Sequence, residues 1–253
     1  MLELTAIVAE VRHPTAHYRV IGFHAPAIAE PVRAGQFVNV LLRPGPLLRR
    51  PFSVYSAVGG VVEIIYRPVG EGTALLADLK EGDRVSLLGP LGRPFEFDPD
   101  WDSVALVSGG LGVAPMLLAA RDARDAGLRV TWVHGARTVT ELSPESAGDR
   151  SVIATDDGSA GHHGSAVAAV PDGVGGVLAC GPNRMLAAVA ARWPDAQVAV
   201  ETYMGCGTGV CLGCAVPLRA GGYDRACKEG PVYRAADVDW EALPSHLHYA
   251  AGA

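Results

Sequence analysis

The sequence is poor in cysteine, in charged residues and in long apolar runs. Its 253 residues include five cysteines, and charged residues make up 19% of the chain. No uninterrupted apolar run approaches the roughly 20 residues of a membrane-spanning helix, and residues 1–6 lack the basic and apolar segments of a secretion signal. These absences exclude a disulfide-rich secreted scaffold, and we expect a cytoplasmic protein with no membrane contact.

Positive charge is too sparse for a nucleic-acid surface. Lys and Arg total 21 against 27 Asp and Glu, for a net charge of −6, and the basic residues are scattered. Nucleic-acid binding needs a concentrated basic patch, so we expect no nucleic-acid partner. Apolar residues make up 49% of the chain, an ordinary globular fraction, and the length suits two domains with a short appendage.

Residues 1–98 have the pattern of a small β-barrel. Short runs with many β-branched residues alternate with Gly, Pro and charged turns, and strands at this spacing suggest closure into a barrel. The expected strands cover residues 2–8, 37–42, 53–56, 61–67 and 84–88. One helix interrupts them at residues 73–79, with Thr73 as its expected N-cap.

Beyond a proline-containing boundary at residues 94–99, strands and helices alternate. The expected strands are residues 103–107, 129–134, 151–155, 176–180 and 197–200, and the expected helices lie near 115–126, 165–170 and 184–192. This alternation predicts a doubly wound parallel sheet over residues 99–198. Residues 199–253 are rich in Gly and Cys and fit neither pattern. The predicted fold is α+β, with a β-barrel, a doubly wound α/β domain and a small C-terminal domain.

Four of the five cysteines crowd into the last segment, as Cys206, Cys211, Cys214 and Cys227. The C-x4-C-x2-C order with a distant fourth cysteine is the plant-type ferredoxin spacing for a [2Fe–2S] cluster. Glycines between them permit positive φ in a tight loop and let backbone N–H groups point at the sulfurs. We expect Cys227 to follow a hairpin that turns at Gly221 and Gly222. Structural zinc sites typically show paired C-x2–4-C knuckles, so the iron–sulfur interpretation is favoured.

Two motifs in the barrel segment together suit a flavin dinucleotide. They are Arg50-Pro-Phe-Ser53 and Tyr66-Arg67-Pro-Val-Gly-Glu-Gly72-Thr73. Taken singly, each is an ordinary charged strand edge. Together they supply an arginine fork for a pyrophosphate, a helix start at Gly72 and Thr73 whose N–H groups bind the same anion, and a Ser53 hydroxyl for a flavin ring nitrogen.

A glycine-rich turn follows the first strand of the α/β segment. The sequence Ser108-Gly-Gly110-Leu-Gly112-Val-Ala-Pro115 stands between a strand and a helix, which is the place of a pyrophosphate-binding turn. Pro115 replaces the third glycine of the Rossmann pattern, and packing alone would also explain the glycines. We predict that Gly110 and Gly112 lie at the nucleotide.

The other nucleotide candidates end later strands. Asp156 or Asp157 can accept hydrogen bonds from a ribose, although either one fits a solvated turn equally well. Cys180, in Cys-Gly-Pro, has the position of an ordinary buried cysteine. No acidic residue ends the strand at His134, and Arg137 suits a 2′-phosphate, so these residues leave NADH and NADPH both open.

The order Arg-Pro-x-Ser, then Tyr-Arg-x-x-Gly-x-Gly-Thr, resembles the FAD barrel of the ferredoxin–NADP reductase superfamily. The Gly-Gly-x-Gly-x-Ala-Pro turn resembles that superfamily's nucleotide turn. The cysteine cluster, with Cys227-Lys-Glu-Gly-Pro-Val, is similar to that of the electron-transfer subunits of class 1B dihydroorotate dehydrogenases. The resemblance covers essentially the whole chain.

The resemblance implies a role for each motif. FAD is then held by Arg50, Pro51, Phe52, Ser53, Ile65, Tyr66, Arg67, Gly72 and Thr73, with Phe52 standing where many relatives have an aliphatic residue. Cys180 borders the meeting point of nicotinamide and flavin, and Asp156 lies at the NAD site. The four clustered cysteines hold the [2Fe–2S] cluster, and NADH is favoured over NADPH.

The implied activity is electron transfer between NAD(H) and the FMN-containing catalytic subunit of dihydroorotate dehydrogenase, through FAD and the cluster, in pyrimidine biosynthesis. Nothing in the chain resembles an orotate site or an FMN phosphate pocket, so we expect the terminal reaction on another polypeptide. The resemblance implies a heterotetramer with that catalytic subunit. One alternative is a NAD(P)H reductase subunit that serves ferredoxin, a hydrogenase or an oxygenase. Another is a zinc-binding scaffold with a degenerate nucleotide fold, which would be colourless.

Overall fold

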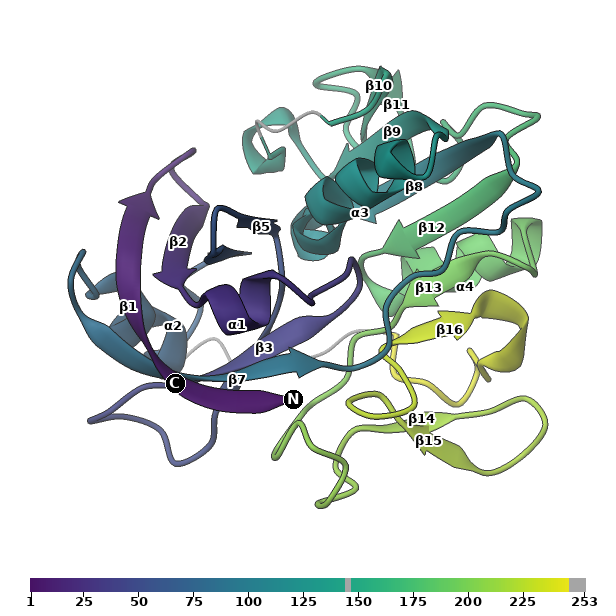
Figure 1. Cartoon of the computed structure of the whole chain (residues 1–253). Coiled ribbons are helices and arrows are strands. Elements are labelled where there is room, and N and C mark those ends of the chain that lie inside the picture. The colour runs from purple at the N-terminus through teal and green to yellow at the C-terminus, as the bar shows by residue number, and fades with distance from the viewer. Residues whose placement is uncertain (144–146, 246–253) are drawn as a thin grey trace.

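The computed structural model describes residues 1–143 and 147–245, which form two seven-stranded sheets and a two-stranded hairpin (Figure 1). The first sheet contains β1 (Leu2–Arg12), β2 (Arg19–His24), β3 (Phe37–Leu41), β4 (Arg50–Ser53), β5 (Ser56–Val58), β6 (Val61–Tyr66) and β7 (Arg84–Leu91). Its order is β4-β3-β7-β1-β2-β6-β5, and neighbouring strands are antiparallel. The sheet curls so that β4 packs against β6, with the rings of Phe52 and Tyr66 6.0 Å apart. The curled sheet confirms the barrel class, and β2 adds a strand that we did not expect. The strand expected at residues 53–56 was wrong, because β4 ends at Ser53 and β5 begins at Ser56.

Two short helices, α1 (Pro26–Ala29) and α2 (Glu71–Ala77), accompany the barrel. The prediction that Thr73 is the N-cap of α2 was wrong, because Gly70 takes that position in an extended conformation. Thr73 lies inside the first turn, where its hydroxyl accepts hydrogen bonds from the N–H groups of Val69 and Gly70 at 2.8 and 3.1 Å. The hydroxyl therefore stabilises the helix start from within, as in a capping box.

The second sheet is doubly wound, as predicted. It contains β8 (Ser103–Gly109), β9 (Arg129–Ala136), β10 (Arg150–Thr155), β11 (His162–His163), β12 (Gly176–Cys180), β13 (Gln197–Ala199) and β16 (Val232–Arg234). Its order is β11-β10-β9-β8-β12-β13-β16, with only β16 antiparallel among these described strands. Leu106 packs in one core with Met116 of α3 (Ala114–Asp125), whereas Val107 packs in another with Leu186 of α4 (Asn183–Arg192). Because neighbouring residues of a strand point to opposite faces, the two helices cover opposite faces of the sheet.

The helix that we expected at residues 165–170 is absent from this described stretch, which is a turn with two i→i+3 hydrogen bonds. Gly164, at φ +125°, precedes it and Pro171 follows it. A segment closed at both ends by such residues is too short to propagate a helix. Short 3₁₀ turns do occur at η1 (Gly110–Val113), η2 (Val139–Glu141) and η3 (Ala235–Asp237).

The C-terminal segment leaves the second sheet after β13 and returns to it as β16. Between them, β14 (Ala215–Pro217) and β15 (Tyr223–Arg225) form an antiparallel hairpin, with Gly221 and Gly222 at φ +90° and +83° in its turn. The hairpin and its glycine turn are as predicted, and β16 is a strand that the sequence pattern did not indicate. No helix in residues 1–143 and 147–245 is long and apolar enough to cross a membrane.

Candidate functional site

The structure brings the two barrel motifs together. A Cβ atom added to Gly72 would lie 2.8 Å from Nε of Arg50, so the Arg50 side chain crosses directly over the first turn of α2. The first N–H groups of a helix have no intrahelical acceptor, and here they lie beside a guanidinium. A forked cation next to free N–H groups is a suitable cradle for a pyrophosphate.

Tyr66 places a buried hydroxyl group at the same face of the barrel. Its hydroxyl is buried and has no hydrogen-bond partner in the described parts of the chain, and burial raises the pKa of Tyr66 to about 12. Buried hydroxyls ordinarily find a partner, so a ligand that reaches this position completes the site. The chemistry of this barrel face therefore fits a flavin dinucleotide.

The remaining barrel candidates lie around these groups. The guanidinium carbon of Arg67 is 6.0 Å from the centre of the Tyr18 ring, a cation–π contact that helps to hold the arginine side chain in place. Ile65 is buried and pairs with Val20, so it contributes apolar packing. Pro51 and Ser53 pair with Asn39 and Phe37 of β3.

The two glycine-containing turns of the second sheet pack against each other. Ser108 at the end of β8 pairs with Cys180 at the end of β12. A Cβ atom on Gly112 would lie 2.0 Å from the carbonyl oxygen of Cys180, so only glycine permits this approach. Gly110 has φ +53°, and a Cβ atom there would meet nothing within 4 Å, which leaves this part of the turn open to a ligand.

Glu201 is a site residue that sequence reasoning missed. Cys180 is buried, and burial together with the Glu201 carboxylate raises the pKa of its thiol. Burial likewise raises the pKa of Glu201 to about 7. Both amide atoms of the Asn183 side chain bond the Glu201 backbone, at 3.1 and 3.2 Å. An acidic residue directly after a strand that neighbours the Cys180 strand was the signal available in the sequence.

The nucleotide candidates after β9 and β10 form a second polar group. The Glu141 carboxylate binds the Arg137 guanidinium at two points, one of them 3.0 Å from Nε. Asp156 is exposed and interacts with the same arginine. Asp157 instead accepts hydrogen bonds from the Ser159 N–H and hydroxyl at 2.9 and 2.6 Å. Of the two aspartates, Asp156 therefore has the freer carboxylate.

Backbone N–H groups converge on the cysteine sulfurs of the C-terminal loop. Cys206 Sγ accepts from Thr208 and Cys211 at 3.3 and 3.4 Å, Cys227 Sγ accepts from Gly209 at 3.1 Å, and Cys211 Sγ accepts from Gly213 at 3.4 Å. Gly207 and Gly209 have φ values of +70° and +84°, as expected for a loop that wraps around an anionic group. Burial opposes ionisation of Cys206, but the N–H groups of Thr208 and Cys211 outweigh it and lower its pKa to about 5.

The four clustered cysteines supply the donors that an iron–sulfur cluster needs. All four are free thiols, and the sulfurs of Cys214 and Cys227 are 3.2 Å apart. In residues 1–143 and 147–245, no group of three or more His, Cys, Asp or Glu side chains is placed to hold a metal ion, so the fit rests on the donors and not on a preformed site. Four thiols, three of which accept hydrogen bonds from backbone N–H groups, form the donor set of a [2Fe–2S] cluster, so the residues fit that group.

Comparison with known proteins agrees with this geometry. Residues 201–239 match the iron-sulfur cluster binding domain of dihydroorotate dehydrogenase B. The chain is 37% identical to a dihydroorotate dehydrogenase B (NAD(+)) electron transfer subunit of Desulforamulus reducens, over 90% of this chain and 94% of that one. It is 39% identical to the subunit of that name from Bacillus caldolyticus, over 83% of this chain and 88% of the relative.

Solved structures show the same architecture. A chain of an NADH-dependent reduced ferredoxin–NADP oxidoreductase superposes with a TM-score of 0.83 at 28% identity, and the match covers 94% of this chain and 91% of that chain. Phthalate dioxygenase reductase shares the fold with a TM-score of 0.63 at 19% identity, over 94% and 95% of the two chains.

The curled barrel, the doubly wound sheet and the cysteine loop define a reductase of the ferredoxin–NADP reductase class that carries an iron–sulfur segment. Within that class, the chain belongs to the family of dihydroorotate dehydrogenase B (NAD(+)) electron transfer subunits.

Proposed function

We propose that this chain moves electrons between NAD(H) and an FMN-containing dihydroorotate dehydrogenase catalytic subunit, through FAD and a [2Fe–2S] cluster, in pyrimidine biosynthesis. The observation that carries the proposal is the position of the cysteine loop. The loop follows β13, which neighbours the Cys180 strand, and its first cysteine contacts barrel strand β3. These contacts support the proposal that the nicotinamide, flavin and cluster sites lie close together in one chain.

Three parts of the chain divide the work. We assign FAD to residues 1–98, NAD(H) to 99–198 and the cluster to 199–253. Arg50, Arg67 and the α2 N–H groups bind the FAD pyrophosphate, with Pro51, Phe52, Ser53, Ile65 and Tyr66 around the rest of the flavin. Gly110, Gly112 and Asp156 face the nucleotide, and Cys206, Cys211, Cys214 and Cys227 bind the irons. When bound, FAD would supply hydride exchange with nicotinamide and one-electron exchange with the cluster, and these residues would hold the groups in place for it.

The electron and proton balance assigns a task to the chain's own groups. Oxidation of dihydroorotate to orotate releases two electrons and two protons, and NAD⁺ takes two electrons and one proton as hydride. Because electrons that pass through a [2Fe–2S] cluster carry no protons, both protons of dihydroorotate would be released at the catalytic subunit, and one proton would have to enter the flavin site of this chain for each hydride formed. Glu201, whose pKa is raised to about 7 by burial, can hold a proton on its carboxylate beside Cys180. Burial raises the pKa of Cys180 and favours its neutral thiol, so we assign Cys180 to the lining of the site.

The loop around Cys211 supports docking of a partner at the cluster. Cys211 itself is exposed, and so are the flanking apolar side chains of Val210 and Leu212, at 81% and 64%. Exposed apolar groups beside a redox centre suit a contact with the catalytic subunit, in a heterotetramer of two chains of each kind.

Reconstitution with the catalytic subunit tests the proposal. The purified chain should release FAD, and not FMN, on heating, and the complex should reduce NAD⁺ when dihydroorotate is supplied. The catalytic subunit alone is the control. A chain without flavin, or a complex that reduces NAD⁺ no faster than the catalytic subunit alone, would contradict the assignment. Fast reduction of a ferredoxin by NADH without that subunit would favour the other reductase class.

A further inference from the structure

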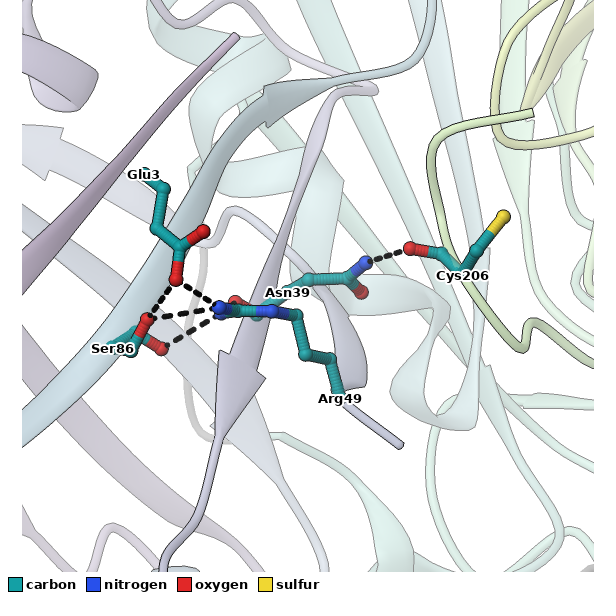
Figure 2. Close-up of polar contacts among 5 residues, drawn as sticks. All are labelled: Glu3, Asn39, Arg49, Ser86 and Cys206. Atoms are coloured by element: carbon teal, nitrogen blue, oxygen red, sulfur yellow. Dashed lines mark hydrogen bonds and ion pairs between the residues drawn. The ribbon is translucent and has the colours of Figure 1, made fainter. Parts of the chain in front are cut away.

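Asn39 is a buried polar residue of the barrel that the assigned flavin and nucleotide sites do not use. It lies in the middle of β3 and is 1% exposed. Its side-chain amide donates a hydrogen bond of 3.2 Å to the backbone carbonyl of Cys206, a residue 167 positions further along the chain (Figure 2). Its own side-chain oxygen is buried without a partner in residues 1–143 and 147–245. Buried polar atoms ordinarily have a hydrogen-bond partner, so we attribute the presence of Asn39 at this core position to its contact with Cys206.

Gly207, the next residue of the loop, is shaped to admit this amide. A Cβ atom on Gly207 would lie 2.0 Å from Nδ2 of Asn39, and the residue has φ +70°. Both conditions require glycine. The Asn39 amide can therefore reach the Cys206 carbonyl because Gly207 has no side chain in its way.

Arg49, which precedes the proposed flavin residue Arg50, stabilises the strand that carries Asn39. Arg49 donates hydrogen bonds to the Asn39 carbonyl at 3.4 Å and to the Ser86 hydroxyl at 2.9 Å, and it pairs with Glu3 (Figure 2). These contacts link β4 and β3 to β7 and β1. Asn39 also pairs with Pro51 in the Arg-Pro-Phe-Ser motif, so one strand pair connects the flavin motif to the cysteine loop.

A second buried asparagine holds the other end of the same segment. Asn183, 3% exposed at the start of α4, bonds the backbone of Glu201 on both sides of its amide. The segment 201–206 is thus attached to helix α4 at its first residue and to barrel strand β3 at its last.

We propose that Asn39 is a positioning residue, which clamps the cluster loop to the flavin barrel and so fixes the electron path between FAD and the cluster. This inference rests on the proposed function. It concerns loop position and not the redox groups themselves, so it has a readout that does not depend on catalysis. The clamp acts on Cys206 through its carbonyl, while Sγ remains free to bind iron.

The test compares Asn39→Leu with Gln36→Leu in the full chain loaded with FAD and iron. Gln36 also donates its side-chain amide to a backbone carbonyl, that of Gly92 at 2.8 Å, but not to the loop. A buried hydrogen bond is worth about 0.5–1.5 kcal/mol, so Asn39→Leu should speed loss of the cluster's visible absorbance to EDTA by about two- to tenfold. Reduction of the flavin by NADH should keep its rate, while the following reduction of the cluster slows. Gln36→Leu should change neither.

A double-mutant cycle keeps the test decisive if Asn39→Leu does not fold. Gly207→Ala should also speed iron loss, through backbone strain and through collision with Nδ2. In an Asn39→Ala background the collision is gone and only the strain remains, so the effect of Gly207→Ala should shrink. Equal effects in both backgrounds, or wild-type iron loss and cluster reduction in Asn39→Leu, would overturn the clamp. A chain that loads iron and FAD but fails to serve the catalytic subunit would contradict the proposed function instead.

Discussion

Arg137 and Glu141, four residues apart, form a two-point ion pair just beyond the end of β9. In dinucleotide-binding sheets the carboxyl end of this second strand receives the adenine ribose, where a carboxylate favours NAD and an arginine accepts the 2′-phosphate of NADP. Here the arginine is present, but its charge is already matched. We therefore predict that the pair favours NADH, and that an unpaired Arg137 could bind a 2′-phosphate.

Replacing Glu141 with Gln should release Arg137. Because the Arg137 side chain is 74% exposed, solvent screens much of the gain. We expect affinity for NADP⁺ to rise about three- to tenfold relative to NAD⁺, below the roughly ten- to hundredfold of an unscreened charge-assisted contact. Isothermal titration with both nucleotides measures the ratio. Glu229→Gln breaks another Arg–Glu pair four residues apart, with Arg225, and should leave the ratio unchanged. An unchanged ratio in Glu141→Gln would remove the pair from the nucleotide site.

Arg67→Ala should weaken FAD retention. A charge-assisted contact to phosphate is worth about 1.5–3 kcal/mol, which corresponds to roughly ten- to a hundredfold in Kd. The cluster spectrum should not change, because the cysteine loop lies in another part of the chain. Flavin occupancy after dilution is the measurement, and the exposed Arg84 of β7 provides the control as Arg84→Ala. Equal retention in both variants would mean that Arg67 is merely a surface residue.

Cys214→Ser should separate the two redox centres. NADH should still reduce the flavin, whereas transfer to the catalytic subunit should fail because the one-electron relay is missing. Iron content and electron paramagnetic resonance report the cluster, and gel filtration with the partner shows whether the complex persists. Cys180→Ser should retain its iron. Full coupled activity of an iron-free Cys214→Ser complex would reject the relay.

Glu201→Gln should change two pH profiles. The folded carboxyl holds its proton up to a pKa of about 7, against 4.5 in its ordinary state, so the folded state binds more protons between these values. Its stabilising effect is complete below pH 4.5 and is lost as the pH rises towards 7. Glu201→Gln should flatten this part of the stability curve, measured by urea unfolding. It should also remove an inflection near pH 7 from hydride exchange with the flavin; an inflection that persists would assign it to another group.

Much of the fold followed from local pattern, since the parallel strands and the glycine turns carry their own signals. The hairpin before Cys227 was also predictable, because paired glycines announce a turn. By contrast, the helix expected at residues 165–170 lost to its flanking Gly164 and Pro171, and Thr73 served its helix from the third position instead of the cap. These outcomes depend on one or two residues of boundary chemistry.

The site was predictable where a motif is contiguous and was missed where it is assembled by tertiary contact. The four cysteines lie within residues 206–227, three before the hairpin and one after it, and their spacing alone indicates the chemistry. Asn39 and Glu201 belong to no motif. The role of Asn39 exists only because β3 meets a loop 167 residues away, and that of Glu201 only because β13 lies beside β12. Isolated amides and carboxylates carry no sequence signal for such neighbours.

The return of the chain to the second sheet as β16 changes how the cluster meets its partners. A redox domain on a flexible linker finds the flavin at a concentration set by linker length. Here β13 and β16 are adjacent, antiparallel strands, and the Gly230 carbonyl accepts a hydrogen bond from Arg93 beyond the barrel strand β7. We therefore expect the cluster segment to be held in a fixed position relative to the flavin once the chain has folded. The diffusional encounter that remains is the one between subunits.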